Sequence, residues 1–378
     1  MAPNNPALAI QTHFEALEDP RIERTRLHDL MDIIVIAICA VICGAEGWED
    51  IAKYGRAKEA WLSTFLRLPN GIPSHDTFRR VFCLLDPCAF HECFQRWVDA
   101  LSAGLGLKRI AIDGKTLRRS FDRAAGKAAL HLVSAWATEQ HLVLGQVAVD
   151  AKSNEITAIP KLLGLLDVSG AMVSIDAMGC QKEIAAKIRE GGADYVLSVK
   201  DNQPTLLEDI QQCFEEGLDT DFADLDHSMH VESHRGHGRE EKHFVHTILN
   251  PEGIRDRALW QDLKAITMVY SERRELGKEQ TEEVRFYIGS RQAKAKTYAN
   301  SIRSHWGIEN GLHWVLDVSF DEDQCRMRTD YSPQNMALLR RLALCLLKKH
   351  GHKGSLRGKR LQSGWNDAFL LEVLSCKP

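Results

Sequence analysis

Arg109-Ile-Ala-Ile-Asp113-Gly-Lys115-Thr-Leu-Arg118-Arg119 is the stretch of sequence that decides the fold. Three apolar residues lead to Asp113, and a glycine and a group of cations follow it. This order predicts a buried strand that delivers a carboxylate to a basic edge of a sheet. Residues 173–181 repeat the pattern, because a hydrophobic run ends at Asp176 before a turn of small residues.

A third carboxylate, Glu309, lies in the helical pattern His305-Trp-Gly-Ile-Glu309-Asn. Three carboxylates brought together by a fold can hold two divalent cations for phosphodiester chemistry. A single aspartate after a strand is more often a turn residue or a helix cap. The pair at equivalent strand ends favours a site, since two facing carboxylates repel each other unless a cation keeps both ionised.

The composition describes a chain with large hydrophobic cores. With 378 residues, of which 44% are hydrophobic and 26% charged, we expect two or three lobes. The net charge of −4 says little about partners, but its distribution is uneven. Residues 326–360 hold ten Lys or Arg and one acid, Asp330. Such a block is typical of a solvated or a nucleic-acid-facing surface, and we favour the second because it flanks Glu309.

The ten cysteines form no regular framework, which favours reduced thiols. The set Cys83, Cys88, His91 and Cys93 matches no standard zinc spacing. Residues 30–45 are very apolar but too short to span a bilayer, so we expect a buried core helix. We see no signal peptide and expect no membrane association.

Residues 1–105 are expected to form a helical domain. Asp29 is placed to cap the apolar helix, and an amphipathic helix begins at Trp48. Further along, Ser74 or Asp76 can cap a short helix. Arg79 and Arg80 project from its first turns, as in helices that dock in a DNA groove, although an ordinary surface helix fits equally well.

From residue 109 the pattern changes to strands. The segments are expected in the order strand, strand, strand, helix, strand, helix, strand, at 109–113, 130–137, 141–149, 155–166, 173–176, 181–190 and 195–199. This is the order of a ribonuclease-H-like mixed α/β sheet. The first and fourth strands are neighbours there, so Asp113 and Asp176 would face one site.

Residues 220–292 predict a β-rich insertion ahead of the last catalytic helix. Six histidines in it would suit a metal site: His227, His230, His234, His237, His243 and His246. The segment around Arg239 is more typical of an exposed hairpin with a basic tip, so we favour DNA contact or solvation over a structural metal.

Taken together, these motifs resemble an insertion-sequence transposase of the DDE superfamily, in the group of H-repeat-associated proteins linked to Rhs elements. The resemblance runs over most of the chain. Each motif alone is weak, but their order is specific. They are Gly71-Ile-Pro-Ser-His-Asp-Thr-Phe-Arg-Arg-Val-Phe82, Ala111-Ile-Asp-Gly-Lys115, Asp176-Ala-Met-Gly-Cys-Gln181, Tyr195-Val-Leu-Ser-Val-Lys-Asp-Asn-Gln203, His237-Gly-Arg239 and His305-Trp-Gly-Ile-Glu-Asn-Gly-Leu-His-Trp314.

The resemblance implies a ribonuclease-H-like catalytic core with an inserted β-rich domain, preceded by an all-helical domain. The expected division is 1–105 for the helical domain, 106–219 and 293–350 for the core, 220–292 for the insertion and 351–378 for a basic tail. Asp113, Asp176 and Glu309 would form the catalytic, metal-binding triad. Mg²⁺, or Mn²⁺ in its place, is the cofactor that carboxylate ligands favour.

The implied partner is double-stranded DNA, at the element ends and at the target, bound by a homodimer. Such a protein is cytoplasmic and nucleoid-associated when bound to DNA. The expected DNA-binding residues are Arg79, Arg80, Lys115, Arg118, Lys200, Asn202, Gln203, Arg239, Arg303, His305 and Trp306.

One part of the family pattern is absent. Many relatives carry Tyr, Arg and Lys around the last acid, and those positions here hold Ile302, His305 and Leu316. Arg303, His305 and His313 are candidates to grip the phosphate instead. A nuclease of the same fold that cuts without joining, and an inactive DNA-binding descendant of a transposase, remain as alternatives.

Overall fold

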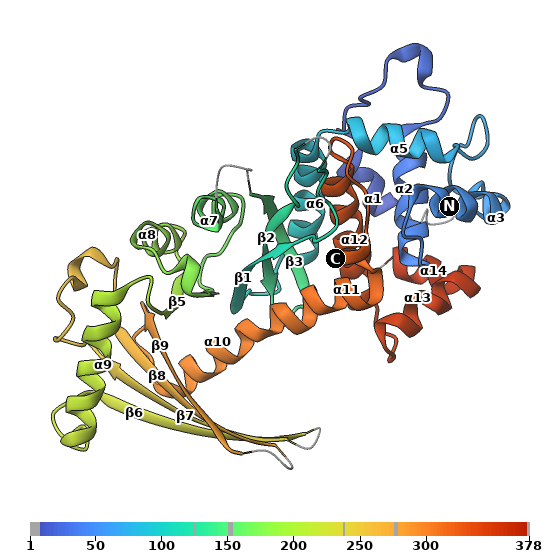
Figure 1. The fold of residues 1–378 in the computed structure, drawn as a ribbon. Helices are drawn as coiled ribbons and strands as arrows, with labels where there is room; N and C mark the ends of the chain where they lie inside the picture. Colours follow the sequence, from blue (N-terminus) through green and yellow to red (C-terminus); the bar gives the residue numbers. More distant parts are fainter. Residues whose placement is uncertain (1–7, 124–125, 150–153, 237–238, 276–278, 376–378) are drawn as a thin grey trace.

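The computed structural model describes residues 8–123, 126–149, 154–236, 239–275 and 279–375. Figure 1 shows a helical body at one end, a sheet covered by helices in the middle, and long strands running away at the other end. The helix α10 (Ala295–Ile308) starts beside these long strands and runs along the central sheet.

The described strands form one nine-stranded sheet in the order β3-β2-β1-β4-β5-β9-β8-β7-β6. Its first part consists of β1 (Arg109–Thr116), β2 (His131–Ala137) and β3 (Leu142–Ala148), which are antiparallel neighbours. β4 (Met172–Ile175) and β5 (Asp194–Val199) then run parallel to β1. The helices α7 (Glu155–Leu163) and α8 (Lys182–Glu190) supply the crossovers. The predicted ribonuclease-H-like mixed sheet is confirmed.

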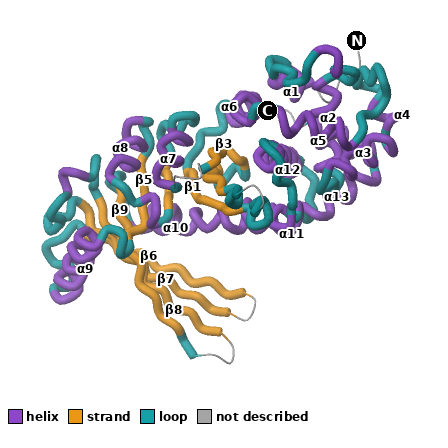
Figure 2. Tube along the Cα trace, turned by 45° about the horizontal axis from the view of Figure 1, so that its top comes forward, coloured by secondary structure: helices purple, strands orange, loops and turns teal. Residues whose placement is uncertain are grey.

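The β-rich insertion continues this sheet. After α9 (Pro204–Asp219) come β6 (His227–Gly236), β7 (Arg239–Leu249), β8 (Ala265–Glu275) and β9 (Thr281–Gly289). β9 pairs with β5 in antiparallel fashion, so the backbone hydrogen bonds run from the core into the insertion without a break. We call strands β6 to β9 the arm, and Figure 2 shows its far end running clear of the core.

The helical body begins with α1 (Leu8–Phe14), α2 (Leu30–Ile42), α3 (Trp48–Ala57), α4 (Glu59–Leu62), α5 (His75–Leu84) and α6 (Pro87–Ser102). α2 is buried along nearly its whole length. The Asp29 side chain caps it by accepting a hydrogen bond from the Met31 N–H, as expected. Ser74, rather than Asp76, caps α5. Among the described helices, none is long and apolar enough to cross a membrane.

The end of the chain folds back onto this body. α12 (Ser332–Lys349) packs against α2, α5 and α6, and α13 (Leu356–Trp365) and α14 (Asp367–Leu374) follow it. As far as Ser375, the basic tail that we expected is therefore a pair of packed helices.

The basic block at 326–360 also differs from expectation, because four of its cations are buried. Lys359 donates to the Leu347 and His350 carbonyl oxygens at the end of α12. Arg360 donates to the Val41 carbonyl oxygen at the end of α2. Carbonyl groups at helix C-termini lack partners within the helix and favour cations. With Arg340 and Arg341, which are also buried, four of the block's ten cations therefore serve packing instead of surface charge.

Side chains protect one edge of the sheet. The Gln146 N–H on edge strand β3 donates to Nε2 of His91 at 3.1 Å. Burial lowers the pKa of His91 to about 4, which keeps the ring neutral and able to accept. The Val143 N–H donates to Sγ of Cys345 at 3.4 Å. An exposed edge strand invites pairing with other chains, and these contacts prevent it at β3.

A buried charge network joins the sheet to the helical body. Glu322 and Arg341 are fully buried, and their ion pair measures 2.8 Å. Lys115 on β1 lies 3.9 Å from the same carboxylate. Burial alone would raise the pKa of Glu322, but Arg341, Arg340 and Lys115 outweigh it and lower the pKa. The ionised form therefore stabilises the native state at neutral pH, and this contribution is lost as the pH falls through the lowered pKa.

We expect Glu322→Gln to destabilise the protein by about 3 kcal/mol, because it leaves Arg341 buried without its charge partner. Urea unfolding at neutral pH measures the change. Replacing both residues, as Glu322→Gln with Arg341→Met, should cost less than the sum of the single changes. Strict additivity would contradict a coupled buried pair.

Candidate active site

Two aspartates end neighbouring parallel strands. β1 and β4 pair in a register that places Ile112 opposite Ile175. The next residue on each strand is Asp113 and Asp176, so the two carboxylates leave the same edge of the sheet side by side. Both are only partly exposed.

The electrostatics of Asp176 reflect this crowding. Burial raises the pKa of the Asp176 carboxyl, and the neighbouring charges of Glu155 and Asp113 raise it further. The Gly179 N–H opposes the shift by donating to Asp176 Oδ1 at 3.4 Å. The site therefore disfavours three ionised carboxylates in the absence of a compensating cation.

Glu309 comes from the helix that crosses the sheet. α10 passes into a π-helical turn, η4 (Glu309–His313), and then into α11 (Trp314–Phe320). Two glycines of this helix face β2 and the residue that follows it. A Cβ on Gly307 would come within 2.9 Å of the Thr138 side chain, and a Cβ on Gly311 within 3.1 Å of the Trp136 ring. These glycines let the helix approach the sheet closely. Glu309 itself is exposed.

His305 lies between the helix and the strand ends. Its Nδ1 is 3.1 Å from the Ser174 hydroxyl on β4. Burial lowers the pKa of His305, while the charges of Asp113, Asp176 and Glu309 act in the opposite direction. All three predicted acids are thus close enough to act on one imidazole.

His313 contacts the first acid directly. Its Nδ1 is 3.3 Å from Asp113 Oδ2, and its Nε2 is buried without a hydrogen-bond partner. His305 and His313 therefore flank the carboxylates from one turn of helix before Glu309 and one turn after it. Arg303, the third candidate to hold phosphate, points instead toward the arm, where it pairs with Glu232.

The sequence interpretation missed a fourth carboxylate, Glu155, in the first turn of α7. Its Oε1 lies 2.7 Å from His131 Nε2, and His131 Nδ1 lies 2.7 Å from the Thr116 hydroxyl. Gly114 makes room for it, since a Cβ there would lie 2.1 Å from Glu155 Oε1. An acid in the first turn of a helix is ordinary by itself, so only the fold shows that this one faces the site.

The carboxylate oxygens of the site suit a hard cation, but they do not surround a single point as the ligands of a bound metal would. Carboxylate oxygens are what Mg²⁺ and Mn²⁺ prefer, and the crowded charge at Asp176 favours a cation. Within the described residues, however, no three His, Cys, Asp or Glu side chains converge on one point at metal-binding distances. Asp113 and Asp176 form an adjacent pair, and Glu309 stands across from them on the helix.

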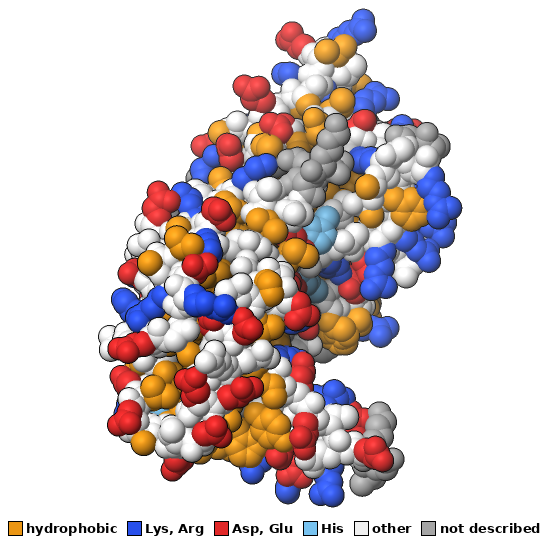
Figure 3. All heavy atoms as spheres, turned by 60° about the vertical axis from the view of Figure 1, so that its left-hand side comes forward, with side chains coloured by type: hydrophobic (Ala, Val, Ile, Leu, Met, Phe, Trp, Pro, Cys, Tyr) orange, Lys and Arg blue, Asp and Glu red, His pale blue; other side chains and the backbone are white. Residues whose placement is uncertain are grey.

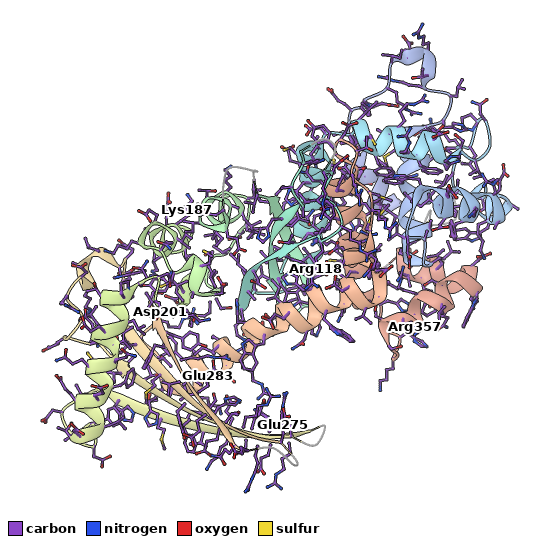
Figure 4. The ribbon with its side chains drawn as sticks, viewed as in Figure 1. Arg118, Lys187, Asp201, Glu275, Glu283 and Arg357 are labelled. Carbon is purple, nitrogen blue, oxygen red and sulfur yellow. The ribbon has the colours of Figure 1, made fainter. Side chains whose placement is uncertain are left out.

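Lys115 requires a correction. We expected it at the DNA-facing edge, but it is only 8% exposed. It pairs with Asp317 and lies 3.8 Å from Asp323. Lys115 is therefore a core cation. Arg118 is 81% exposed at the central sheet, and its Nε lies 3.2 Å from Asp323 Oδ2 (Figure 4).

The segment after β5 braces the loop that follows Asp176. The Asn202 side chain donates to the Ala177 carbonyl oxygen at 2.7 Å. The Gln203 side chain donates to the Cys180 carbonyl oxygen at 2.9 Å. Both amides thus position the Asp176 loop, whereas Lys200 is exposed.

A cavity of about 420 Å³ lies between the arm and α10, next to Glu309. Trp306 lines it and is 37% exposed, with the Arg285 guanidinium 5.2 Å from its ring centre. Arg303 lines it too and pairs with Glu232 at 2.8 Å. Arg239 pairs with Glu241 at 3.0 Å.

Arg79 and Arg80 are exposed on α5, in the helical body and away from the carboxylates. Arg79 borders a cavity of about 650 Å³ that Arg326 and Arg328 also line. Acids line the same cavity, so its charge is mixed.

The arm histidines do not form a metal site among the described residues. Side chains alternate between faces along a strand, which separates them. His227 stacks on His246, with ring centres 5.3 Å apart. His234 contacts Arg303, and His243 lies 2.8 Å from the Ser271 hydroxyl. His237 lies outside the described residues. The nine cysteines that the structure describes are free thiols.

Comparison with known proteins agrees with this architecture. Residues 104–346 match the family model described as transposase DDE domain, and residues 11–98 match the model of its associated domain. The H repeat-associated putative transposase YhhI of Escherichia coli K12 is 38% identical, over 97% of each chain. The putative transposase YncI of Escherichia coli O157:H7 is 39% identical, over 96% of this chain and 93% of the relative.

A solved structure of the piggyBac transposase synaptic complex with hairpin DNA has a TM-score of 0.46 and 11% identity, over 97% of this chain and 81% of that one. Two family models and full-length relatives thus agree on one assignment. The chain belongs to the DDE transposases and is similar throughout to the H-repeat-associated group.

Proposed function

We propose that this protein cuts DNA at the ends of its own insertion sequence and joins the freed 3′ ends to target DNA. The observation that carries the proposal is the register of β1 and β4, which sets Asp113 beside Asp176 and opposite the helix of Glu309. Membership of a transposase family supports the choice of DNA as substrate.

In this proposal Asp113, Asp176 and Glu309 hold Mg²⁺, or Mn²⁺ in its place. When bound, such cations neutralise charge on the phosphate and lower the pKa of bound water. Glu309 would join the aspartate pair from the helix α10–η4, which packs across β1 and β4. Glu155 adds negative charge beside Asp176 and is held in place by His131.

The flanking histidines have separate roles. His313 holds the Asp113 carboxylate from the helix side, and His305 ties the helix to Ser174 on β4. His305 also occupies the position where many relatives place an arginine. Burial lowers the pKa of His305, which favours the neutral ring, and in this proposal His305 positions the helix instead of pairing with phosphate.

Exposed cations, some near this edge and some on the helical body, are proposed to bind the double-stranded DNA backbone. Arg118 and Lys200 come from the core, and Arg79 and Arg80 from α5. Arg239, Arg303 and Trp306 contribute from the cavity beside Glu309. Binding should weaken steeply with salt, because each neutralised phosphate releases counterions. Two element ends would require two copies of the chain.

A second candidate function is DNA binding without cleavage. The observation that favours it is the open arrangement of the carboxylates, since no three described ligands meet at one point. The two functions differ in a single readout, which is metal-dependent cleavage of DNA that carries the element's ends.

Replacing Asp113, Asp176 or Glu309 with Ala should leave DNA binding within a few-fold and reduce cleavage at least 1000-fold, an effect of about 4 kcal/mol on the barrier. Labelled DNA with the element's ends, incubated with Mg²⁺, Mn²⁺ or EDTA, measures cleavage and joining. The matched control is Glu183→Ala, an exposed acid on α8. Cleavage retained in any of the three variants would refute that residue's role, and binding without cleavage by the wild type would support the second candidate.

Asp176→Asn should raise the melting temperature of the metal-free protein by about 1–3 °C at pH 8. The pKa of Asp176 is raised by burial and by its acidic neighbours, so its ionised form destabilises the native state above that pKa. The gain should shrink as the pH falls through the raised pKa, where the wild-type carboxyl takes up a proton. Thermal melts from pH 5 to pH 8 measure it, and a gain that grows toward low pH would contradict the assignment.

A further inference from the structure

The arm has two faces, and α10 covers only one of them. Its other face, which we call the outer face, carries a row of apolar side chains across all four strands. Val231 lies opposite Phe244, Phe244 opposite Tyr270, and Tyr270 opposite Val284. The residues between these positions point to the cavity beside Trp306, as their alternation requires.

This row lacks a covering layer among the described residues. Val231 is 39% exposed and Val284 47% exposed. Nearer the core, aromatic side chains do cover this face of the arm. Phe214 on α9 packs against Phe286, and the Phe222 ring stacks on His246. Figure 3 shows hydrophobic side chains gathered at the lower end of the molecule, among charges of both signs. Contiguous exposed apolar surface of this kind marks interaction sites.

Charged side chains border the row on the side away from the core. Lys242 pairs across the strands with Glu272, and Glu240 pairs with Arg274. Arg235 and Glu282 complete the border on β6 and β9. The border thus has three cations and three acids, with no net charge. A DNA-binding surface needs an excess of positive charge, which this one lacks.

We propose that the outer face binds the outer face of a second copy of the chain. A two-fold axis along the strands, between β7 and β8, would place β8 of the partner over β7. Phe244 then meets the partner's Tyr270, and Val231 meets the partner's Val284. Lys242 meets the partner's Glu272, and Glu240 meets the partner's Arg274. The apolar row and its charged border are complementary to themselves under this operation.

The size of the contact predicts a weak dimer. With strands about 4.8 Å apart and a rise of about 3.4 Å per residue, the free face covers roughly 400 Å² per protomer. A total of roughly 800 Å² is below the usual range for stable complexes, so association should depend strongly on concentration. The twist of each sheet should rotate the two arms by about 30°.

Charge reversals in a mixing experiment test this arrangement. Lys242→Glu alone sets acid against acid in the dimer, and Glu272→Lys alone sets cation against cation. We expect each variant to associate at least tenfold more weakly than the wild type in sedimentation equilibrium without DNA. An equimolar mixture of the two should restore association, because each acid of one chain then meets a cation of the other. Contacts within a single chain cannot produce that recovery.

The pair Lys53→Glu and Glu49→Lys on α3 is the matched control, since it reverses the same charges at an exposed pair away from the arm. These variants and their mixture should associate like the wild type. A wild-type protein that stays monomeric up to its solubility limit would overturn the proposal, as would a mixture that fails to recover. Variants that lose DNA binding while self-association is unchanged would instead make the outer face a DNA contact. That outcome is read in a separate DNA-binding assay, whereas the association measurement uses no DNA or metal and is therefore independent of cleavage activity.

Discussion

Repulsion between carboxylates at the ends of two adjacent parallel strands is the constraint around which the core is built. The pairing of β1 with β4 places the backbones of Asp113 and Asp176 at neighbouring strand ends. Glu155 on α7 adds to the negative charge from a third direction. The surrounding structure limits the cost through the Gly179 N–H, His313 and His131. Charge crowded in this way disfavours full ionisation of the carboxylates unless positive charge compensates it.

The helix that carries Glu309 ties this edge to the rest of the molecule. Its close approach depends on Gly307 and Gly311, and its π-helical turn sets Glu309 out of the regular helical repeat. Beyond it, Lys115, Glu322 and Arg341 form a buried network that joins β1 to α12. Because α12 packs against α2, the sheet and the helical body are coupled through fully buried charges. Movement of one against the other would have to separate these ions in a low-dielectric interior.

The two edge strands of the sheet, β3 and β6, differ in how their surroundings cover them. At β3, His91 and Cys345 occupy backbone N–H groups and close the edge. The arm at the other end leaves β6 as the last strand and exposes apolar side chains on its outer face. Its inner face encloses the cavity with Trp306 and Arg303 beside Glu309. Because side chains alternate along each strand, the apolar row and the cavity lie on opposite faces of the arm.

Much of the fold of the core could be predicted from local patterns in the sequence. Alternation and apolar runs predicted each core strand, and the order of strands and helices predicted the mixed sheet, because both signals are local in the sequence. The aspartates at equivalent strand ends were recognisable for the same reason. The caps at Asp29 and Ser74 also follow from neighbouring residues.

Tertiary structure decided what depends on distant partners. Lys115, Arg340, Arg341, Lys359 and Arg360 look like surface cations in sequence, but they are buried because acids or helix ends far along the chain need their donors. The family resemblance implies that Asn202 and Gln203 lie near DNA, and the structure adds that their amides brace the Asp176 loop. Glu155 was invisible as a site residue until the fold brought α7 to β1. Sequence thus determined which residues could do chemistry at the strand ends, and packing decided which charges were left free, since burial and pairing are properties of three-dimensional neighbours.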